Sequence, residues 1–376
     1  MAEAVAWAAR SLPSRPSAPI LAGLLIKAES AGVTMSSFDH ETSAQIQVKA
    51  DVIDQGEVLV SGKLLADIAR SLPNKPVELV STDSRLELVC GSARFTLQTL
   101  PVADYPNLPE MPAATGNVES DVFSRAVSQV VVAAGRDELL PVFTGVRVEI
   151  ENETVSLLAT DRYRMALKEL PWSPVSSSAE GAALVPAKVL SETAKSMTSG
   201  ESVTLSLANS GIGDGMIGFE GDGAGGTRQI TTRLLNGEFP KVRHLMNVNA
   251  AVSVRVNTAD VIASVRRVAL VAERNTPLRM IIREGSIELD AATGDQAQAT
   301  EAIEAVVENH AGGEMMAAVG FNPQYLNDAL GALDTPYVYF AFTAPAKPCL
   351  IQGLESLDGE PLGDYRHVIM LMRLPN

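Results

Sequence analysis

Apolar residues recur with helical spacing in three stretches of the chain, at 2–12, 120–134 and 258–272. In the second stretch the stripe consists of Val122, Ala126, Val127 and Val130. Residues at this spacing share one face of a helix, so each stretch predicts an amphipathic helix with one buried side. Asp121 stands at the start of the second stretch, where a carboxylate suits the positive end of the helix dipole.

Each helical stretch is followed by a proline and then by two β-rich runs around a short polar turn. The prolines are Pro19, Pro141 and Pro277, and the turns span residues 29–32, 151–153 and 283–286. This pattern predicts a β-hairpin. Each hairpin is followed by a short strand that leads into a second helical run, starting near residues 58, 183 and 317.

These markers recur about 120 to 135 residues apart and divide the chain into three similar units. The predicted units are 1–114, 115–248 and 249–376. Each is expected to be an α+β domain with two helices packed on one side of an antiparallel sheet. The glycine-rich stretch 209–226 lengthens the second unit and predicts a surface hairpin or a mobile loop.

The composition fits a folded chain, with 46% hydrophobic residues and a net charge of -15. An acidic protein resists random contact with nucleic acid, but its net charge does not exclude a basic patch on one face. Cys90 and Cys349 are far apart and lack metal-ligand spacing, which favours a reducing compartment over a disulfide framework. No signal peptide or membrane span is evident, so we expect a cytoplasmic protein.

Sequence motifs for catalysis are missing. The chain contains no phosphate-binding Gly-x-x-x-x-Gly-Lys-Ser/Thr loop, no zinc-ligand spacing and no Gly-x-Ser-x-Gly elbow. We therefore predict no catalytic residue, no metal and no cofactor. The pair Asp161-Arg162 is better explained as a charged turn at a strand end than as an acid and a base.

Five features together resemble one known family over nearly the whole chain. They are the threefold unit and the segments ARSLPSRPSAPILAGLLI, RFTLQTLPVADYPNLP, LLATDRYRMAL and VIMLMRL. The family is the bacterial DNA polymerase sliding clamp, the β subunit of replicative DNA polymerase III. The resemblance implies a non-enzymatic homodimer, closed head to tail into a ring of six domains. Helices would line the hole around duplex DNA, and a clamp loader would open the ring with ATP.

The chain departs from the family pattern in three places. The β-strand that precedes the first helix in the family has no counterpart here, so we expect a truncated start and an incomplete first sheet. Arg162-Tyr163-Arg164 stands where the family usually has Gly-His-Arg. At the end, Leu371 replaces a proline and Pro375-Asn376 extend the tail.

The resemblance also implies a pocket between the second and third units that binds short peptides of the clamp loader, the polymerase and other proteins. Flexible apolar side chains would form its floor and two arginines its edge. Its expected residues are Phe143, Thr160, Arg164, Met165, Pro240, Leu245, Asn322, Pro348, Val368, Met370, Met372 and Arg373. From the residues alone, ordinary core and solvated arginines explain the same pattern. The tail is too apolar to hang free, and a strand would place Val368, Met370 and Met372 on one face.

Two further sets of residues are expected at interfaces. Basic residues on or beside the helices would contact phosphates without reading sequence. They are Arg15, Lys63, Arg70, Arg125, Lys188, Arg267 and Arg274, and a solvated helix face is the alternative. Ring closure would pair the strand at 88–100, which carries Arg94, with the strand at 296–307, which carries Glu301 and Glu304. Two other functions stay open: a monomeric protein-binding module without ring closure, and an enzyme built from the repeated units.

Overall fold

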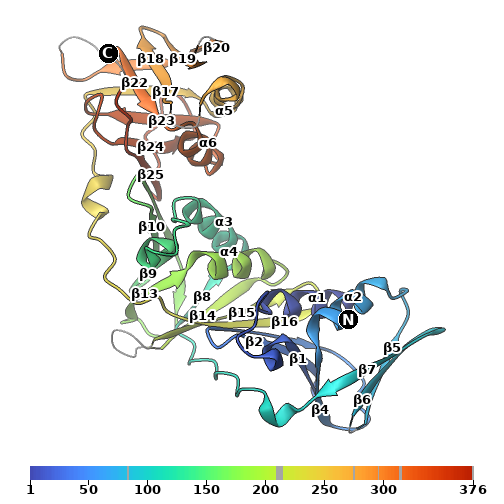
Figure 1. Ribbon diagram of the computed structural model, residues 1–376. Coiled ribbons are helices and arrows are strands. Elements are labelled where there is room, and N and C mark those ends of the chain that lie inside the picture. The colour runs from blue at the N-terminus through green and yellow to red at the C-terminus, as the bar shows by residue number, and fades with distance from the viewer. Residues whose placement is uncertain (83, 209–214, 274–275, 295, 313–315, 375–376) are drawn as a thin grey trace.

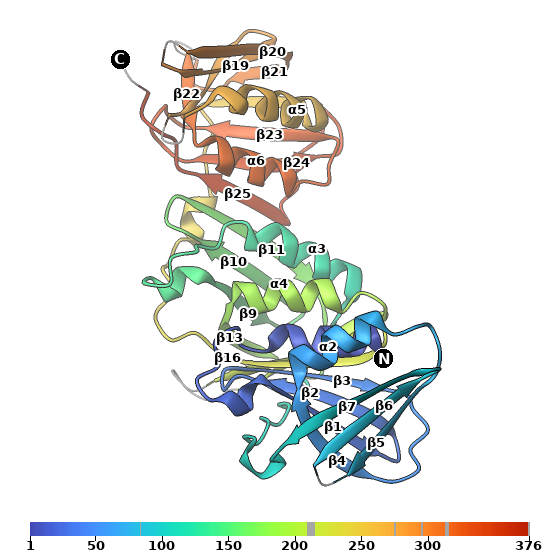
Figure 2. The ribbon, with the colours of Figure 1, turned by 45° about the vertical axis from the view of Figure 1, so that its right-hand side comes forward.

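The structure is a computed structural model that describes all residues except 83, 209–214, 274–275, 295, 313–315 and 375–376. Three similar domains follow one another along an arc, and their helices face its concave side (Figure 1). Figure 2 shows the same helices in front of the sheets that carry them. Among the described residues, no helix is long and apolar enough to span a membrane.

The first domain has two helices, which pack against each other on one side of its strands. They are α1 (Ala2–Ala8) and α2 (Gly62–Ser71). The strands are β1 (Gly23–Glu29), β2 (Gly32–Phe38), β3 (Thr42–Val48), β4 (Gly56–Ser61), β5 (Val77–Thr82), β6 (Arg85–Cys90) and β7 (Ala93–Leu100). The predicted helix at 2–12 ends with a 3-10 turn, Ala9–Ser11.

The second domain repeats this order and adds two strands, one before its first helix and the short strand Ser173–Pro174. Its helices are α3 (Ser120–Val131) and α4 (Ala187–Ser196). The strands are β8 (Gly116–Glu119), β9 (Gly145–Glu151), β10 (Thr154–Thr160), β11 (Arg164–Pro171), β12 (Ser173–Pro174), β13 (Glu180–Pro186), β14 (Ser202–Leu207), β15 (Met216–Gly223) and β16 (Gly226–Arg233). Residues 216–226 of the glycine-rich stretch thus form a hairpin with β16, and residues 209–214 lie outside the described part.

The third domain also begins with a strand ahead of its first helix. Its helices are α5 (Thr258–Val268) and α6 (Pro323–Gly331). The strands are β17 (Val252–Asn257), β18 (Leu278–Arg283), β19 (Ser286–Thr293), β20 (Ala297–Glu304), β21 (Val306–Asn309), β22 (Ala318–Phe321), β23 (Tyr337–Phe342), β24 (Cys349–Leu354) and β25 (Tyr365–Ile369). All three predicted hairpin turns lie where the pattern placed them, between β1 and β2, β9 and β10, and β18 and β19.

Two sheets run across the domain joints. β3 of the first domain pairs with β16 of the second, and β11 of the second pairs with β25 of the third. The 12-stranded sheet ends at β5, whereas the equivalent strands β14 and β23 pair with β8 and β17. The arc is therefore held together by backbone hydrogen bonds as well as by side chains.

Candidate functional site

An apolar cluster lies at the joint between the second and third domains. It contains three of the predicted pocket residues, Met165, Leu245 and Val368. Met165 and Val368 are paired across the joint in the register of β11 and β25. Phe239 packs in the same cluster and is buried. The segment that leads out of the second domain therefore reaches this joint, as its sequence predicts.

Ion pairs hold the linker between the second and third domains beside this cluster. Arg243 donates to Glu149 at 2.9 Å and to Glu169 at 3.0 Å. Arg366 on β25 donates to the other oxygen of Glu169 at 3.1 Å. The three pairs tie the linker, β9, β11 and β25 together. Because Arg243 is about half exposed, each pair adds little by itself.

The C-terminal tail packs against both domains, as its apolar character predicts. The backbone N–H of Met370 donates to the Tyr163 carbonyl at 2.8 Å, and that of Met372 donates to the Gly320 carbonyl at 2.8 Å. The predicted one-faced strand is wrong, because β25 ends at Ile369 and its last residues are buried on both sides. Met370 lies outside the strand and is 38% exposed.

Arg164, which the sequence predicts at the edge of the pocket, is held in the joint by two carboxylates. Its side chain is buried, with Nε 3.0 Å from Asp161 Oδ2 and Nη1 2.6 Å from Asp328 Oδ2. Its guanidinium also lies 4.3 Å from the centre of the Tyr325 ring. A buried cation needs such partners, because unpaired charge in the interior is strongly destabilising. Arg164 joins β11 to α6 through Nε and Nη1.

The turn that precedes Arg164 is rigid. Thr160 Oγ1 donates to the Arg164 carbonyl at 2.7 Å and accepts from the Arg162 N–H at 3.1 Å. Asp161 Oδ1 accepts from the N–H groups of Tyr163 and Arg164, both at 3.0 Å. The prediction of a charged strand-end turn is confirmed, but Asp161 pairs with Arg164 rather than with Arg162.

The remaining predicted pocket residues divide between the interior and the surface. Asn322 caps α6 by accepting from the N–H groups of Gln324 and Tyr325. The apolar cluster does not include Phe143, Met370 or Met372. Pro240 and Pro348 are half-buried and Arg373 is exposed. The predicted residues thus fall in two neighbouring parts of the joint, a buried cluster and a surface at the β10–β11 turn.

Two buried ring side chains lie behind the tail strand. Tyr365 donates its O–H to the Gln129 carbonyl at 3.2 Å, and its oxygen lies 2.9 Å from His367 Nδ1. Burial, with a smaller contribution from Arg164, lowers the pKa of His367 to about 3. Burial raises the pKa of Tyr365 above its usual value. Both groups are neutral at physiological pH, so this part of the joint carries no charge of its own.

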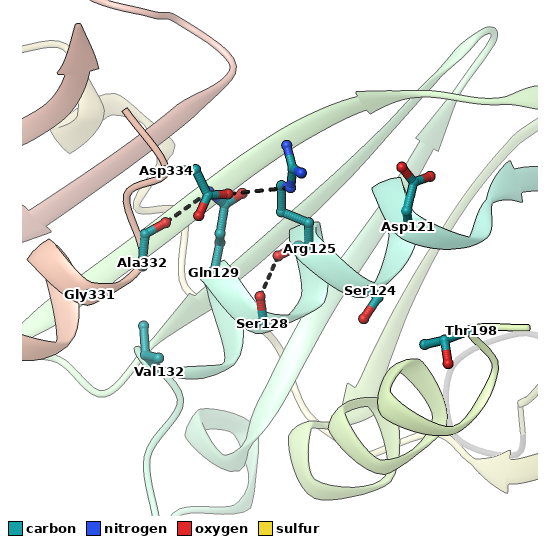
Figure 3. A pocket seen from close by; sticks show the side chains of 10 residues that line it. All are labelled: Asp121, Ser124, Arg125, Ser128, Gln129, Val132, Thr198, Gly331, Ala332 and Asp334. Carbon is teal, nitrogen blue, oxygen red and sulfur yellow. Dashed lines mark hydrogen bonds and ion pairs between the residues drawn. The ribbon is translucent and has the colours of Figure 1, made fainter. Parts of the chain in front are cut away.

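A cavity of about 490 Å³ lies on the helix side of the same joint (Figure 3). Residues of α3 and the end of α6 line it, and two of these make contacts between the domains. Gln129 Nε2 donates to the Ala332 carbonyl at 2.8 Å, and Arg125 Nε lies 3.3 Å from Asp334 Oδ2. This cavity is not the predicted peptide pocket. No sequence pattern indicated Gln129, because it lies among the apolar residues of a helix.

The predicted DNA-facing residues that the structure describes lie on or beside the helices, which face the concave side of the arc (Figure 1). Lys63 and Arg70 are on α2, Lys188 is on α4 and Arg267 is on α5, while Arg15 follows the first 3-10 turn. All five are exposed. Arg274 lies outside the described residues. Acidic partners offset part of this positive charge.

Three of these cations are paired with carboxylates. Arg125 pairs with Asp334 as described above, Arg70 lies 2.5 Å from Asp67, and Arg267 makes a two-pronged contact with Glu301. The hydrogen bond from Arg267 lowers the pKa of Glu301. Among the described residues, Arg15, Lys63 and Lys188 form no ion pair. The helices and their flanking segments therefore carry both free and partly neutralised cations.

The two strands expected at ring closure are open at their edges. Within the described part of the chain, β20 is the outermost strand of the four-stranded sheet, and β7 pairs with β4 through Thr99 and Leu100 alone. Arg94 and Glu304 are exposed, each on the opposite face of its strand from the residues that pack inward. Glu301 points to the other face, toward Arg267 on α5, so it is not the free carboxylate that the sequence suggested.

Among the residues that the structure describes, no group of three or more His, Cys, Asp or Glu side chains is arranged to hold a metal ion. Cys90 and Cys349 are both buried free thiols. Burial raises the pKa of the Cys349 thiol well above its usual value. A protonated, inaccessible thiol is a poor nucleophile.

Three profiles of known domains match successive parts of the chain. The N-terminal domain of the DNA polymerase III beta subunit matches residues 1–109, its central domain residues 117–241 and its C-terminal domain residues 243–373. The beta sliding clamp of Streptomyces coelicolor is 51% identical over all of this chain and 97% of that relative. The beta sliding clamp homolog GriR of Streptomyces muensis is 38% identical over 99% of this chain and 97% of that relative.

Solved structures share the fold. The DNA polymerase sliding clamp of Bacillus subtilis matches with a TM-score of 0.87 and 23% identity, covering 100% of this chain and 97% of that chain. A sliding clamp from Pseudomonas aeruginosa bound to griselimycin gives the same TM-score, identity and coverage. At this identity the likeness establishes the three-domain architecture, and the family profiles and the Streptomyces relatives carry the assignment further.

Proposed function

Since this chain belongs to the family of DNA polymerase III β subunits, the bacterial sliding clamps, we propose that it encircles duplex DNA as a ring of two copies. It would tether the replicative polymerase and other proteins to DNA without catalysing a reaction itself. ATP hydrolysis would belong to the clamp loader, and the ring would act in the cytoplasm, where the chromosome lies.

The observation that carries the proposal is the repeated joint between domains. β3 and β11 hold the same place in their domains, as the strand that follows the first hairpin. β16 and β25 also correspond, as the last strand of each domain. Each joint within the chain pairs one strand of the first kind with one of the second. The unused strands of these two kinds are β20 and β7.

These two edges are complementary ends of one arc. A second copy can place its β7 on β20, and the same contact formed again at the other end closes a ring of six domains with two-fold symmetry. Half-buried Phe95 and Ile303 lie on the helix-facing sides of the two strands, so that side offers apolar contact. Exposed Arg94 and Glu304 offer opposite charges on the outer face.

A ring that holds DNA by enclosure needs no tight contact with it. Exposed Arg15, Lys63 and Lys188, on or beside helices that face the concave side, suit brief contacts with phosphates, which carry no sequence information. Such contacts weaken steeply as salt rises. Retention on DNA should therefore depend on whether the DNA has ends.

The test loads the protein onto nicked circular plasmid with a clamp loader and ATP. The complex is then gel-filtered in about 0.5 M salt, which suppresses phosphate contacts. We expect retention on circles and loss after a restriction enzyme makes them linear. Equal retention on both forms would contradict enclosure. Light scattering on the free protein separates a dimer from a monomeric binding module.

We further propose that partner peptides dock beside the apolar cluster at the second joint. Met165, Leu245 and Val368 would supply apolar contact beneath the site, and the exposed surface at Tyr163 and Met370 would supply its rim. Micromolar affinity, about 8 kcal/mol, would suffice because the ring keeps its partner close to the template. The Met370 variant described in the Discussion tests this placement.

A further inference from the structure

Arg162 is held in a backbone conformation that normally favours glycine. Its φ is 81°, in the left-handed region where an L side chain is strained. The turn holds it there through the bond from its own N–H to Thr160 and the bonds around Asp161. At a position kept by a rigid turn, the direction of the Cα–Cβ bond is fixed, so the side chain leaves the backbone along one direction.

The side chain of Arg162 is exposed and rests against two aromatic rings. Its guanidinium carbon lies 5.6 Å from the centre of the Phe143 ring and 5.7 Å from that of Tyr163. A guanidinium over aromatic rings is stabilised by cation–π attraction, and its N–H donors point outward in the guanidinium plane. These donors match the two oxygens of a carboxylate.

No acid of the described chain uses those donors. Among the described residues, the only hydrogen bond of Arg162 is through its backbone N–H, and its guanidinium forms no ion pair. The neighbouring carboxylate, Asp161, is committed to Arg164 through Oδ2 and to the turn through Oδ1. Arg162 is therefore an aligned cation without a partner.

The surroundings of this cation are apolar and exposed. Tyr163 is 55% exposed and Met370 is 38% exposed, and the Tyr163 carbonyl accepts from the Met370 N–H. Two residues after Tyr163 the chain enters the apolar cluster at Met165. A positive fork beside exposed aromatic and thioether side chains suits a peptide with an acidic and an apolar residue better than it suits a bare phosphate chain.

We propose that Arg162 selects docking peptides that carry an aspartate or glutamate next to their apolar anchor. The inference rests on the proposed docking of partner peptides at this joint and adds the chemistry of one position. The carboxylate of the peptide pairs with the guanidinium, while Phe143 and Tyr163 hold that guanidinium in place. Arg162 is thus a specificity-determining residue, and the apolar contacts supply the affinity shared by all partners.

The experiment uses fluorescein-labelled peptides that carry Gln, Leu and a C-terminal Phe. At each other position of the peptide in turn, one peptide has Asp and its matched partner has Asn. Binding is measured by anisotropy with the full-length chain and with Arg162→Gln, which keeps the same backbone strain. At one position we expect the Asp peptide to bind about tenfold more tightly to the unchanged chain. With Arg162→Gln we expect the two peptides to bind equally, at the affinity of the Asn peptide.

A second variant separates charge from geometry. Arg162→Lys keeps the charge and loses the fork, so we expect it to retain only part of the preference. Equal binding of Asp and Asn peptides to the unchanged chain at every position overturns the inference and leaves the docking site standing. Failure of all peptides to bind overturns the docking site as well. Loss of DNA retention by Arg162→Gln with the peptide preference unchanged shows a phosphate contact instead.

Discussion

Arg164 and Asp328 meet across the joint of the second and third domains, with Nη1 and Oδ2 2.6 Å apart. The arginine is the first residue of β11, and the aspartate lies on α6. The contact joins the sheet of one domain to a helix of the next, so it fixes the angle between them. Its partners are mostly buried, which makes it worth more than the ion pairs on the surface.

Asp328→Ala should destabilise the joint, because it leaves the buried guanidinium of Arg164 with Asp161 as its only acidic partner. We expect a loss of about 1–3 kcal/mol in the free energy of unfolding, measured by urea titration. Asp334→Ala is the matched control, since its pair with Arg125 is exposed on the same joint and should cost less than about 1 kcal/mol. Equal losses for the two variants would contradict the role given to Arg164.

His367 should make stability depend on pH. Its pKa is about 3 in the folded chain, and the unfolded chain has the ordinary value of 6.5. Between these values the unfolded state binds more protons, so stability is fully present above 6.5 and falls as the pH drops toward 3. The slope attributable to this group approaches about 1.4 kcal/mol per pH unit. His367→Asn, which keeps an N–H near Tyr365, should be less stable at pH 7 and should lose this slope.

The measurement is the urea midpoint of the unchanged chain and the variant from pH 7 to pH 5. His244→Asn serves as the control, because His244 is exposed on the linker between the domains. It should leave the slope unchanged. A slope that survives in His367→Asn would show that other groups cause the acid sensitivity.

Arg94→Glu should weaken the dimer if β7 meets β20. Arg94 and Glu304 both lie on outer strand faces, so reversal of one charge replaces attraction with repulsion. We expect dissociation to increase about three- to tenfold, and the added change Glu304→Arg to restore much of the loss. Dilution followed by light scattering gives the dissociation constants. The single variant Glu304→Arg is measured as well. If the dissociation constant of the double variant rises by the product of the two single-variant increases, these residues do not face each other.

Met370→Lys should abolish docking of partner peptides and leave the dimer intact. Met370 is exposed beside Tyr163, so a charge there is tolerated by the fold but disrupts an apolar contact with a peptide. Met370→Leu is the control and should bind within about threefold of the unchanged chain. Normal binding of a clamp-loader or polymerase peptide by Met370→Lys would show that the site lies elsewhere, for example at the cavity beside Gln129.

Local patterns in the sequence predicted the repeated elements well. The stripe from Val122 to Val130 is the buried face of α3, and the turn at Glu29–Gly32 joins β1 to β2. Both features depend on the spacing of residues that are close in sequence, and this spacing can be taken directly from the sequence. Helix ends were less certain, since α5 ends at Val268 and gives way to a 3-10 turn.

Contacts between distant residues were not predictable in the same way. From the sequence alone, Arg164 at the start of a strand is interpreted as a surface cation. Its partner Asp328 is distant in sequence and is found only in the folded structure. The same holds for Arg267 on α5, whose partner Glu301 lies on β20, the third strand after that helix. The tail strand was misjudged because alternation assumes one solvent face, whereas Val368 and Ile369, on opposite faces of β25, are both buried.

The continuous sheets across the two internal joints bear on where the ring gives way under mechanical load. At the second joint the backbone ladder runs from Arg164 opposite Ile369 to Lys168 opposite Tyr365, and the linker holds the separated edges at high effective concentration. In the proposed ring, the joint between two chains would have a similar ladder without a covalent connection. Once separated, its edges would diffuse away from each other. A clamp loader that applies force to the whole ring would therefore open it at the joint between chains, while each arc of three domains moves as a rigid body.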